Sequence, residues 1–145
     1  MSRRTSIVKA LANKLKDIST ANGYKTELFE ASFDKLKFWD EVNNFPSIYV
    51  VAGSETREYH PGGFKWGFLG VSLKVYTKGE DCQQLLENLL EDIENVIDNS
   101  GLLVYDADNG YEITDILITS ITTDEGLLDP YGVGEVNLQV RYEIR

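Results

Sequence analysis

The chain has 145 residues and a formal net charge of −10, with 24 acidic side chains against 14 basic ones. That length predicts a single domain, residues 1–145, able to bury a core of its own. Nucleic-acid recognition needs lysine and arginine to neutralise phosphates, so the acidic balance argues against a DNA- or RNA-binding protein. With one cysteine there is no internal disulfide framework, and no apolar run reaches the roughly 18 residues of a membrane span.

The first segment with a clear pattern predicts an amphipathic helix from Ser6 to about Thr20. Its apolar residues recur at spacings of three and four, and its lysines fall on the opposite side. Thr5 or Ser6 suits the N-cap, and the pair Asn22-Gly23 suits the end of the helix because both residues tolerate a positive φ.

The middle of the chain predicts a long hairpin. A strand is expected from Tyr24 to Phe29. Residues 33–42 are ambiguous, because their apolar spacing suits a short helix but the adjacent Phe38 and Trp39 would cover two of its faces. The apolar run Ser47 to Val51 indicates a buried strand, and alternation from Phe68 to Tyr76 indicates another. Between these two strands, Gly53 to Lys65 is polar and rich in turn residues, which predicts a long projecting loop.

Glu80 to Asn99 predicts the second helix, closed by Ser100-Gly101. Its leucine, isoleucine and valine residues repeat at three and four and form a broad stripe that includes Leu85. The wet side is acidic and has no lysine or arginine. Its residues are Glu80, Asp81, Glu87, Glu91, Asp92, Glu94 and Asp98.

The remaining chain predicts strands. Leu102 to Tyr105 and the segment from Tyr111 flank Asp108-Asn109-Gly110, and Asn-Gly favours a type I′ hairpin turn. Another strand is expected from Ile113 to Thr122, and strict alternation from Val136 to Ile144 predicts the last. The fold class is therefore α+β: a mostly antiparallel sheet, two main helices on one face, and long projecting hairpin loops.

The sequence nominates no reaction, no metal and no cofactor. His60 is the only histidine and lies in a glycine-rich loop, a poor platform for catalytic geometry. Asp106 to Gly110 resembles the opening of a calcium loop, but the twelfth position, Leu117, lacks the bidentate glutamate that such loops need. A small ligand-binding domain would need convergent polar groups in a pocket, and none stands out.

Two loops remain as candidates for docking onto other proteins. They carry aromatic and leucine residues that a plain turn does not need. The residues of the first are Glu55, Tyr59, His60, Phe64 and Trp66. Those of the second are Asp124, Leu127, Leu128 and Tyr131. The alternative for Trp66 and Phe64 is that their side chains simply fold back onto the sheet.

The chain resembles the tail terminator and tail-completion proteins of long-tailed bacteriophages. The resemblance rests on the helix that contains Ile7 to Ala12, on Phe45 to Val50 at the start of a strand, and on Thr123 to Gly132 before a final strand that includes Val140 to Tyr142. It covers the order of elements over nearly the whole chain, Asp34 to Val42 excepted.

This resemblance implies a structural protein of the virion, made in the host cytoplasm, that forms a ring, a hexamer, on the last ring of the tail tube. The implied partners are further copies of the chain, the tail tube protein and a head-completion or connector protein, with genomic DNA passing through unbound. An acidic channel wall would repel that DNA, and the candidates for it are Glu87, Glu91, Glu94 and Asp98. The alternative within the same particle is another neck or adaptor subunit, such as a stopper.

Overall fold

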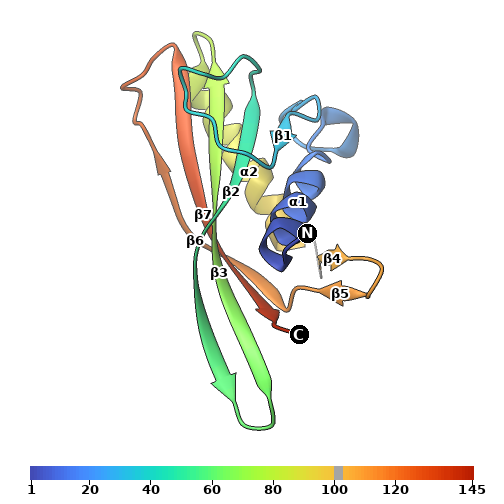
Figure 1. The fold of residues 1–145 in the computed structure, drawn as a ribbon. Helices are drawn as coiled ribbons and strands as arrows, with labels where there is room; N and C mark the ends of the chain where they lie inside the picture. Colours follow the sequence, from blue (N-terminus) through green and yellow to red (C-terminus); the bar gives the residue numbers. More distant parts are fainter. Residues whose placement is uncertain (100–102) are drawn as a thin grey trace.

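The computed structural model describes residues 1–99 and 103–145 as two helices packed on a twisted sheet (Figure 1). The helices are α1 (Arg3–Leu15) and α2 (Cys82–Asn99), with a 3₁₀ turn, η1 (Thr20–Asn22), after the first. The strands are β1 (Ser32–Phe33), β2 (Ser47–His60), β3 (Phe64–Lys78), β4 (Val104–Asp106), β5 (Tyr111–Glu112), β6 (Asp115–Thr123) and β7 (Tyr131–Glu143). The predicted α+β class is confirmed.

Five strands form the main sheet, in the order β1-β2-β3-β7-β6, and β4 and β5 form a separate two-stranded sheet. Every neighbouring pair in the main sheet is antiparallel except the short parallel pair of β1 with β2. Both helices lie on the same face of this sheet, and we call the other face the open face (Figure 1).

The core lies between the helices and the sheet. Alternate residues of β7 are buried along its whole length, which confirms the period-two pattern of the sequence. The amino-terminal end of α2 rests on two glycines of β7. A Cβ at Gly132 would lie 2.8 Å from the Cys82 carbonyl oxygen, and one at Gly134 would lie 3.1 Å from a methyl group of Leu86. No described helix is both long and apolar enough to cross a membrane.

The strand predicted from Tyr24 to Phe29 is wrong, because these residues form a loop that covers α2 instead of joining the sheet. The backbone N–H groups of Lys25 and Thr26 donate to the Asp92 carboxylate at 3.0 and 2.8 Å. Asp92 is therefore buried, although the sequence placed it on the wet face of the helix. Leu85, expected in the core, is 45% exposed.

The first helix begins and ends earlier than predicted. Ser2 is the N-cap, since its hydroxyl accepts a hydrogen bond from the N–H of Thr5, and the helix ends at Leu15. Gly23, at φ 88°, closes the 3₁₀ turn rather than α1.

The ambiguous stretch after Phe33 has no regular structure and packs against the open face at one end of the sheet. Val42, Tyr49 and Tyr76 form a second, small buried cluster there, and the Tyr76 hydroxyl donates to the carbonyl of Lys37 at 2.5 Å. These contacts explain why neither helical nor strand periodicity was visible in this part of the sequence.

The long loop predicted from Gly53 to Lys65 is wrong. The ladder between β2 and β3 continues to the pair His60 and Phe64, and only residues 61–63 form the turn. The Asp108-Asn109-Gly110 turn between β4 and β5 is present, but only Gly110 has a positive φ, so it is not of type I′. The Ser100-Gly101 end of α2, and Leu102, lie outside the described residues.

Candidate docking surfaces

The hairpin of β2 and β3 extends beyond the body of the protein as a narrow projection, which we call the arm (residues 55–66) (Figure 1). The last residue of β7 paired with β3 is Glu143, opposite Trp66. Beyond that row the Ile144 N–H still donates to the carbonyl of Lys65 at 2.9 Å, and the two strands of the arm otherwise pair only with each other among the described residues. Tyr59 and Phe64, near its tip, are 65% and 57% exposed.

A bulge at the base of the arm reverses which side each β2 residue faces. Ala52 pairs with Val71, but the next recorded pair joins Glu55 to Leu69, so β2 holds one extra residue there. Because Leu69 faces the helices, Glu55 does too. A carboxylate is thereby placed at the rim of the core, where its side chain is only 5% exposed.

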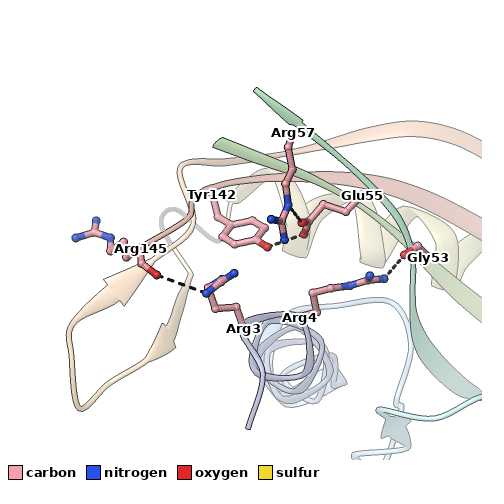
Figure 2. A network of polar contacts seen from close by, with 7 residues as sticks. All are labelled: Arg3, Arg4, Gly53, Glu55, Arg57, Tyr142 and Arg145. Atoms are coloured by element: carbon pink, nitrogen blue, oxygen red, sulfur yellow. Dashed lines mark hydrogen bonds and ion pairs between the residues drawn. The ribbon is translucent and has the colours of Figure 1, made fainter. Parts of the chain in front are cut away.

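Glu55 lies at the centre of a polar network that joins the arm to both ends of the chain (Figure 2). Its carboxylate accepts hydrogen bonds from the hydroxyl of Tyr142 at 2.5 Å and from Nε of Arg57 at 2.8 Å. At the start of α1, the guanidinium of Arg4 donates to the carbonyl of Gly53, in the bulge itself. Arg3 donates to the carbonyl of Arg145 at 3.5 Å.

The network keeps Glu55 ionised although it is buried. Burial alone would raise its pKa, but the hydrogen bonds from Tyr142 and Arg57 and the positive charges of Arg57 and Arg4 lower the pKa below its usual value. Burial and the same carboxylate raise the pKa of Tyr142. We call this network of Glu55, Tyr142, Arg57, Arg3 and Arg4 the brace. It holds an ionised carboxylate at the base of the arm and sets the direction in which the arm leaves the sheet.

Gly67 makes room for this brace. A Cβ at this position would lie 2.7 Å from Cε1 of Tyr142, closer than real Cβ contacts come. The ring of Tyr142, on β7, lies across Gly67 of β3. Its hydroxyl thereby reaches Glu55 on β2, the strand on the other side of β3 (Figure 2). A side chain at Gly67 would displace the ring and with it the hydrogen bond.

The five residues predicted for the first loop therefore divide into two groups. Tyr59, His60 and Phe64 are exposed near the tip, with Glu58 3.9 Å from the His60 imidazole. Glu55 is used internally, and Trp66 is half-buried on the open face. The guanidinium of Arg141 covers the Trp66 ring at 5.6 Å. The alternative that aromatic residues fold back onto the sheet thus holds for Trp66 only.

Asp124 shapes the second predicted loop, which connects β6 to β7. Its carboxylate accepts backbone hydrogen bonds from Leu128, Gly126 and Val133 at 3.0 to 3.4 Å, and one from the amide of Gln83. Partial burial tends to raise its pKa, but these donors outweigh that effect and lower it. Asp124 is therefore committed to the internal order of the loop.

The leucines and the tyrosine of this loop are placed differently from one another. Leu127 is 86% exposed, while Leu128 is half-buried. Tyr131 packs against the rings of Trp39 and Phe45 at centroid distances of 5.4 and 5.7 Å. Of the four residues predicted for this loop, Leu127 is thus the one that is exposed.

The two surfaces lie at opposite ends of the sheet. In the ladder of β3 with β7, Tyr131 pairs with Lys78 at one end and Glu143 pairs with Trp66 at the other. The loop between β6 and β7 therefore leaves the end opposite the arm, as Figure 1 shows. Because the two surfaces leave opposite ends of the sheet, the two predicted loops do not form one site.

The acidic residues of α2 lie on the side of the helix turned away from the sheet. Glu87, Glu91 and Asp98 are exposed and Glu94 is half-buried. Lys25 forms an ion pair with Glu91 at 2.8 Å. The described residues contain no group of three or more His, Cys, Asp or Glu placed to hold a metal ion.

Sequence reasoning missed two features. Phe29 is 77% exposed at a positive φ of 53°, on the loop that was taken for a strand. The brace was also missed, because its members come from α1, β2 and β7, and residues from such distant segments give no local signal that they meet.

Comparisons with known proteins agree over the full length of the chain. Residues 1–145 match the family model described as "Bacteriophage Tail Tube Terminator Protein". The tail tube terminator protein p142 of Escherichia phage T5 is 42% identical over 154 residues, which covers 99% of this chain and 95% of that protein. A chain from the virion of a native gene transfer agent particle shares the fold, with a TM-score of 0.60 at 11% identity and 95% coverage of both chains. The chain belongs to the family of bacteriophage tail tube terminator proteins.

Proposed function

We propose that copies of this chain close into a ring on the end of the tail tube, stop its polymerisation and join the tail to the head. The observation that carries the proposal is family membership over all 145 residues, which makes the chain a structural, tail-capping protein of the virion. Six copies per ring is the number that the resemblance of the sequence implies. Rings of identical subunits need two different, complementary patches on each subunit.

The position between tube and head requires two axial surfaces with different partners. The arm and the loop between β6 and β7 meet this requirement because they leave opposite ends of the sheet. We assign Tyr59, His60 and Phe64 to docking at one end, and Leu127 and Leu128 to docking at the other. One end meets the tail tube protein and the other a head-completion or connector protein.

The brace gives the arm the rigidity that docking of a ring needs. A flexible arm would lose conformational entropy on binding, at about 0.5–1.5 kcal/mol for each immobilised side chain. The bond from Tyr142 to Glu55 ties the base of the arm to β7, and the bond from Arg4 to the Gly53 carbonyl ties it to α1, before any partner arrives. Glu55 thus supports docking from inside the subunit rather than through direct contact.

The proposed role is mechanical rather than catalytic. The single histidine, His60, lies at the exposed tip of the arm, in a position suited to contact with a protein. The acidic side of α2, with Glu87, Glu91, Glu94 and Asp98, is proposed to face the channel and repel the DNA that passes through it. The tail of the virion is where the chain acts, after synthesis in the host cytoplasm.

The test is a double variant, Tyr59→Ser with Phe64→Ser, which keeps the strands of the arm and removes its exposed aromatic rings. We expect a soluble protein with unchanged urea unfolding that no longer caps tail tubes, as measured by tube length in electron micrographs. Leu85→Ser is the control, since Leu85 is also an apolar residue with an exposed side chain but lies on α2. Tubes capped at normal length by the double variant would refute the docking role of the arm.

A second measurement separates the terminator from other neck subunits. Wild-type protein is mixed with tail tubes in one sample and with the head connector in another, and bound rings are counted by mass photometry and microscopy. Binding to tubes with arrest of their growth supports the proposal. Binding to the connector alone, with tubes growing unchecked, would assign the chain to the neck instead.

A further inference from the structure

The main sheet has a free strand edge on each side, along β2 beyond the short β1 and along β6. Among the described residues, β1 pairs with β2 only at Ile48 and Tyr49, which leaves β2 open from Val50 onward except where Arg4 binds the Gly53 carbonyl. At the other side of the sheet, β6 has β7 as its only ladder partner in the described part of the chain. Unpaired strand edges are templates for pairing with another strand.

The β6 edge carries little of the protection usual for an exposed edge strand. Its nine residues include no lysine and no proline, and its only charged residue, Asp115, pairs with Arg141 at 3.0 Å. Leu117 and Ile121 are 54% and 37% exposed. Its one protective feature is a bulge between Ile118 and Ser120. An edge of this length and apolar character is better suited to a covered position than to permanent exposure to water.

The direction of the strands makes the two edges compatible. From β2 through β3 and β7 to β6 there are three antiparallel steps, so β6 runs opposite to β2 within one subunit. In a neighbouring subunit related by rotation about an axis parallel to the strands, β2 runs in the same direction as β2 of the first subunit. The β6 of one copy therefore meets the β2 of the next as an antiparallel pair, and the same contact repeats around a ring.

A groove beside β2 provides space for the side chains of such a strand. It measures about 340 Å³ and lies between Val50 to Ala52 of β2 and residues of α1 and the segment after β1, including Val8 and Leu36. The groove is on the helix side of the sheet. Ile118 and Ile121 point to that same side of β6, since they pair with the buried Leu138 and Val136.

The bulges on the two edges also correspond. The β2 bulge falls between the rows of Val71 and Leu69 in the ladder with β3. The β6 bulge falls next to the row of Leu138, the residue of β7 paired with Val71. The extra residues of both edges therefore lie at adjacent levels of the sheet.

From these observations we infer that neighbouring subunits join by antiparallel pairing of the β6 edge of one copy with the β2 edge of the next, with the apolar side of β6 seated in the groove beside β2. The inference rests on the proposed ring, and it names the two patches that close it. It predicts one sheet that continues from subunit to subunit.

The test uses pairs of cysteines on the two edges of one chain. Val51→Cys or Thr56→Cys on β2 is combined with Leu117→Cys, Ser120→Cys or Thr122→Cys on β6, all on the open face. Within one subunit the two edges are three strand spacings apart, about 14 Å, beyond the roughly 7 Å that a disulfide spans. Any disulfide therefore joins two subunits. The natural Cys82 is buried, which raises its pKa and keeps it out of the reaction.

Oxidation of caps assembled on tubes should give a ladder of covalent multimers up to the closed ring. Because the pairing is antiparallel, the β6 residue that cross-links to a cysteine at position 56 should have a lower number than the β6 residue that cross-links to a cysteine at position 51. Single variants on one edge should stay monomeric, and so should Ser120→Cys combined with Glu87→Cys on the outer side of α2. Closed rings in micrographs with no cross-link from any of the β2 and β6 combinations would overturn the inference while leaving the ring itself intact. Absence of rings and of capping by wild-type protein would instead overturn the proposed function.

Discussion

Replacing Tyr142 with phenylalanine tests the brace at the base of the arm. The ring stays, and only the hydroxyl that donates to Glu55 at 2.5 Å is lost. Hydrogen bonds to charged groups contribute about 1.5–3 kcal/mol, and because Arg57 still binds the carboxylate we expect a loss near the lower end. With an m-value of about 2 kcal/mol per molar, the urea midpoint should fall by somewhat under 1 M.

The matched control is Tyr105→Phe. Tyr105 is also a buried tyrosine, packed edge-on against Tyr142 at 6.1 Å, and its hydroxyl has no recorded hydrogen-bond partner among the described residues. Loss of the Tyr105 hydroxyl should change the free energy of unfolding by less than about 0.5 kcal/mol. Equal effects of the two substitutions would refute the view that the bond to Glu55 stabilises the fold.

The dependence on pH provides an internal check on the same variant. The pKa of Glu55 in the folded protein lies below its ordinary value of 4.5, so its contribution to stability is present above pH 4.5 and is lost as the pH falls through the folded pKa. The difference in unfolding free energy between wild type and Tyr142→Phe should therefore shrink below pH 4.5. A difference that stays constant as the carboxylate becomes protonated would mean that the hydroxyl acts independently of the carboxylate.

Three further substitutions test other parts of the molecule. Asp92→Ala should cost about 2–4 kcal/mol in urea unfolding, because two N–H groups of the loop over α2 lose their acceptor. Leu127→Asp should leave the urea midpoint unchanged, since the side chain is 86% exposed, yet abolish docking at that end in a pull-down with tubes or connector. Changing Glu87, Glu94 and Asp98 together to lysine should leave rings intact but lower infectivity. Normal infectivity of that phage would contradict an acidic channel wall.

Elements with one wet and one dry side were predictable from the sequence. The α2 helix shows helical spacing and β7 shows period-two alternation, because in each a buried side alternates with an exposed one. The arm gives the opposite case. Its residues in β2 after Ala52 are exposed or half-buried on both faces, so no apolar alternation marks it as a strand. Pro61, Gly62 and Gly63 then made a three-residue turn look like a long loop.

The sequence predicted candidate site residues correctly only where the prediction required no more than an exposed side chain. Tyr59, Phe64 and Leu127 were chosen as surface aromatic and apolar residues, and their side chains are exposed. Glu55 and Asp124 were chosen from the same loops, but their carboxylates accept internal hydrogen bonds. Whether an acidic side chain near a loop faces solvent or organises the backbone depends on donors elsewhere in the chain. That information is in the tertiary structure and not in local spacing.

One extra residue in β2 connects these observations. Up to Ala52 the even-numbered residues of the strand face the helices, and from Glu55 onward the odd-numbered ones do. Without the bulge, Ser54 would take the place of Glu55 opposite Leu69, and a short hydroxyl would replace the carboxylate that binds Arg57. The same bulge exposes the Gly53 carbonyl that Arg4 binds. It therefore connects the arm to the first turn of α1 and interrupts the β2 edge next to the level of the β6 bulge. In the ring that we propose, one local irregularity would then serve both the axial contact and the contact around the ring.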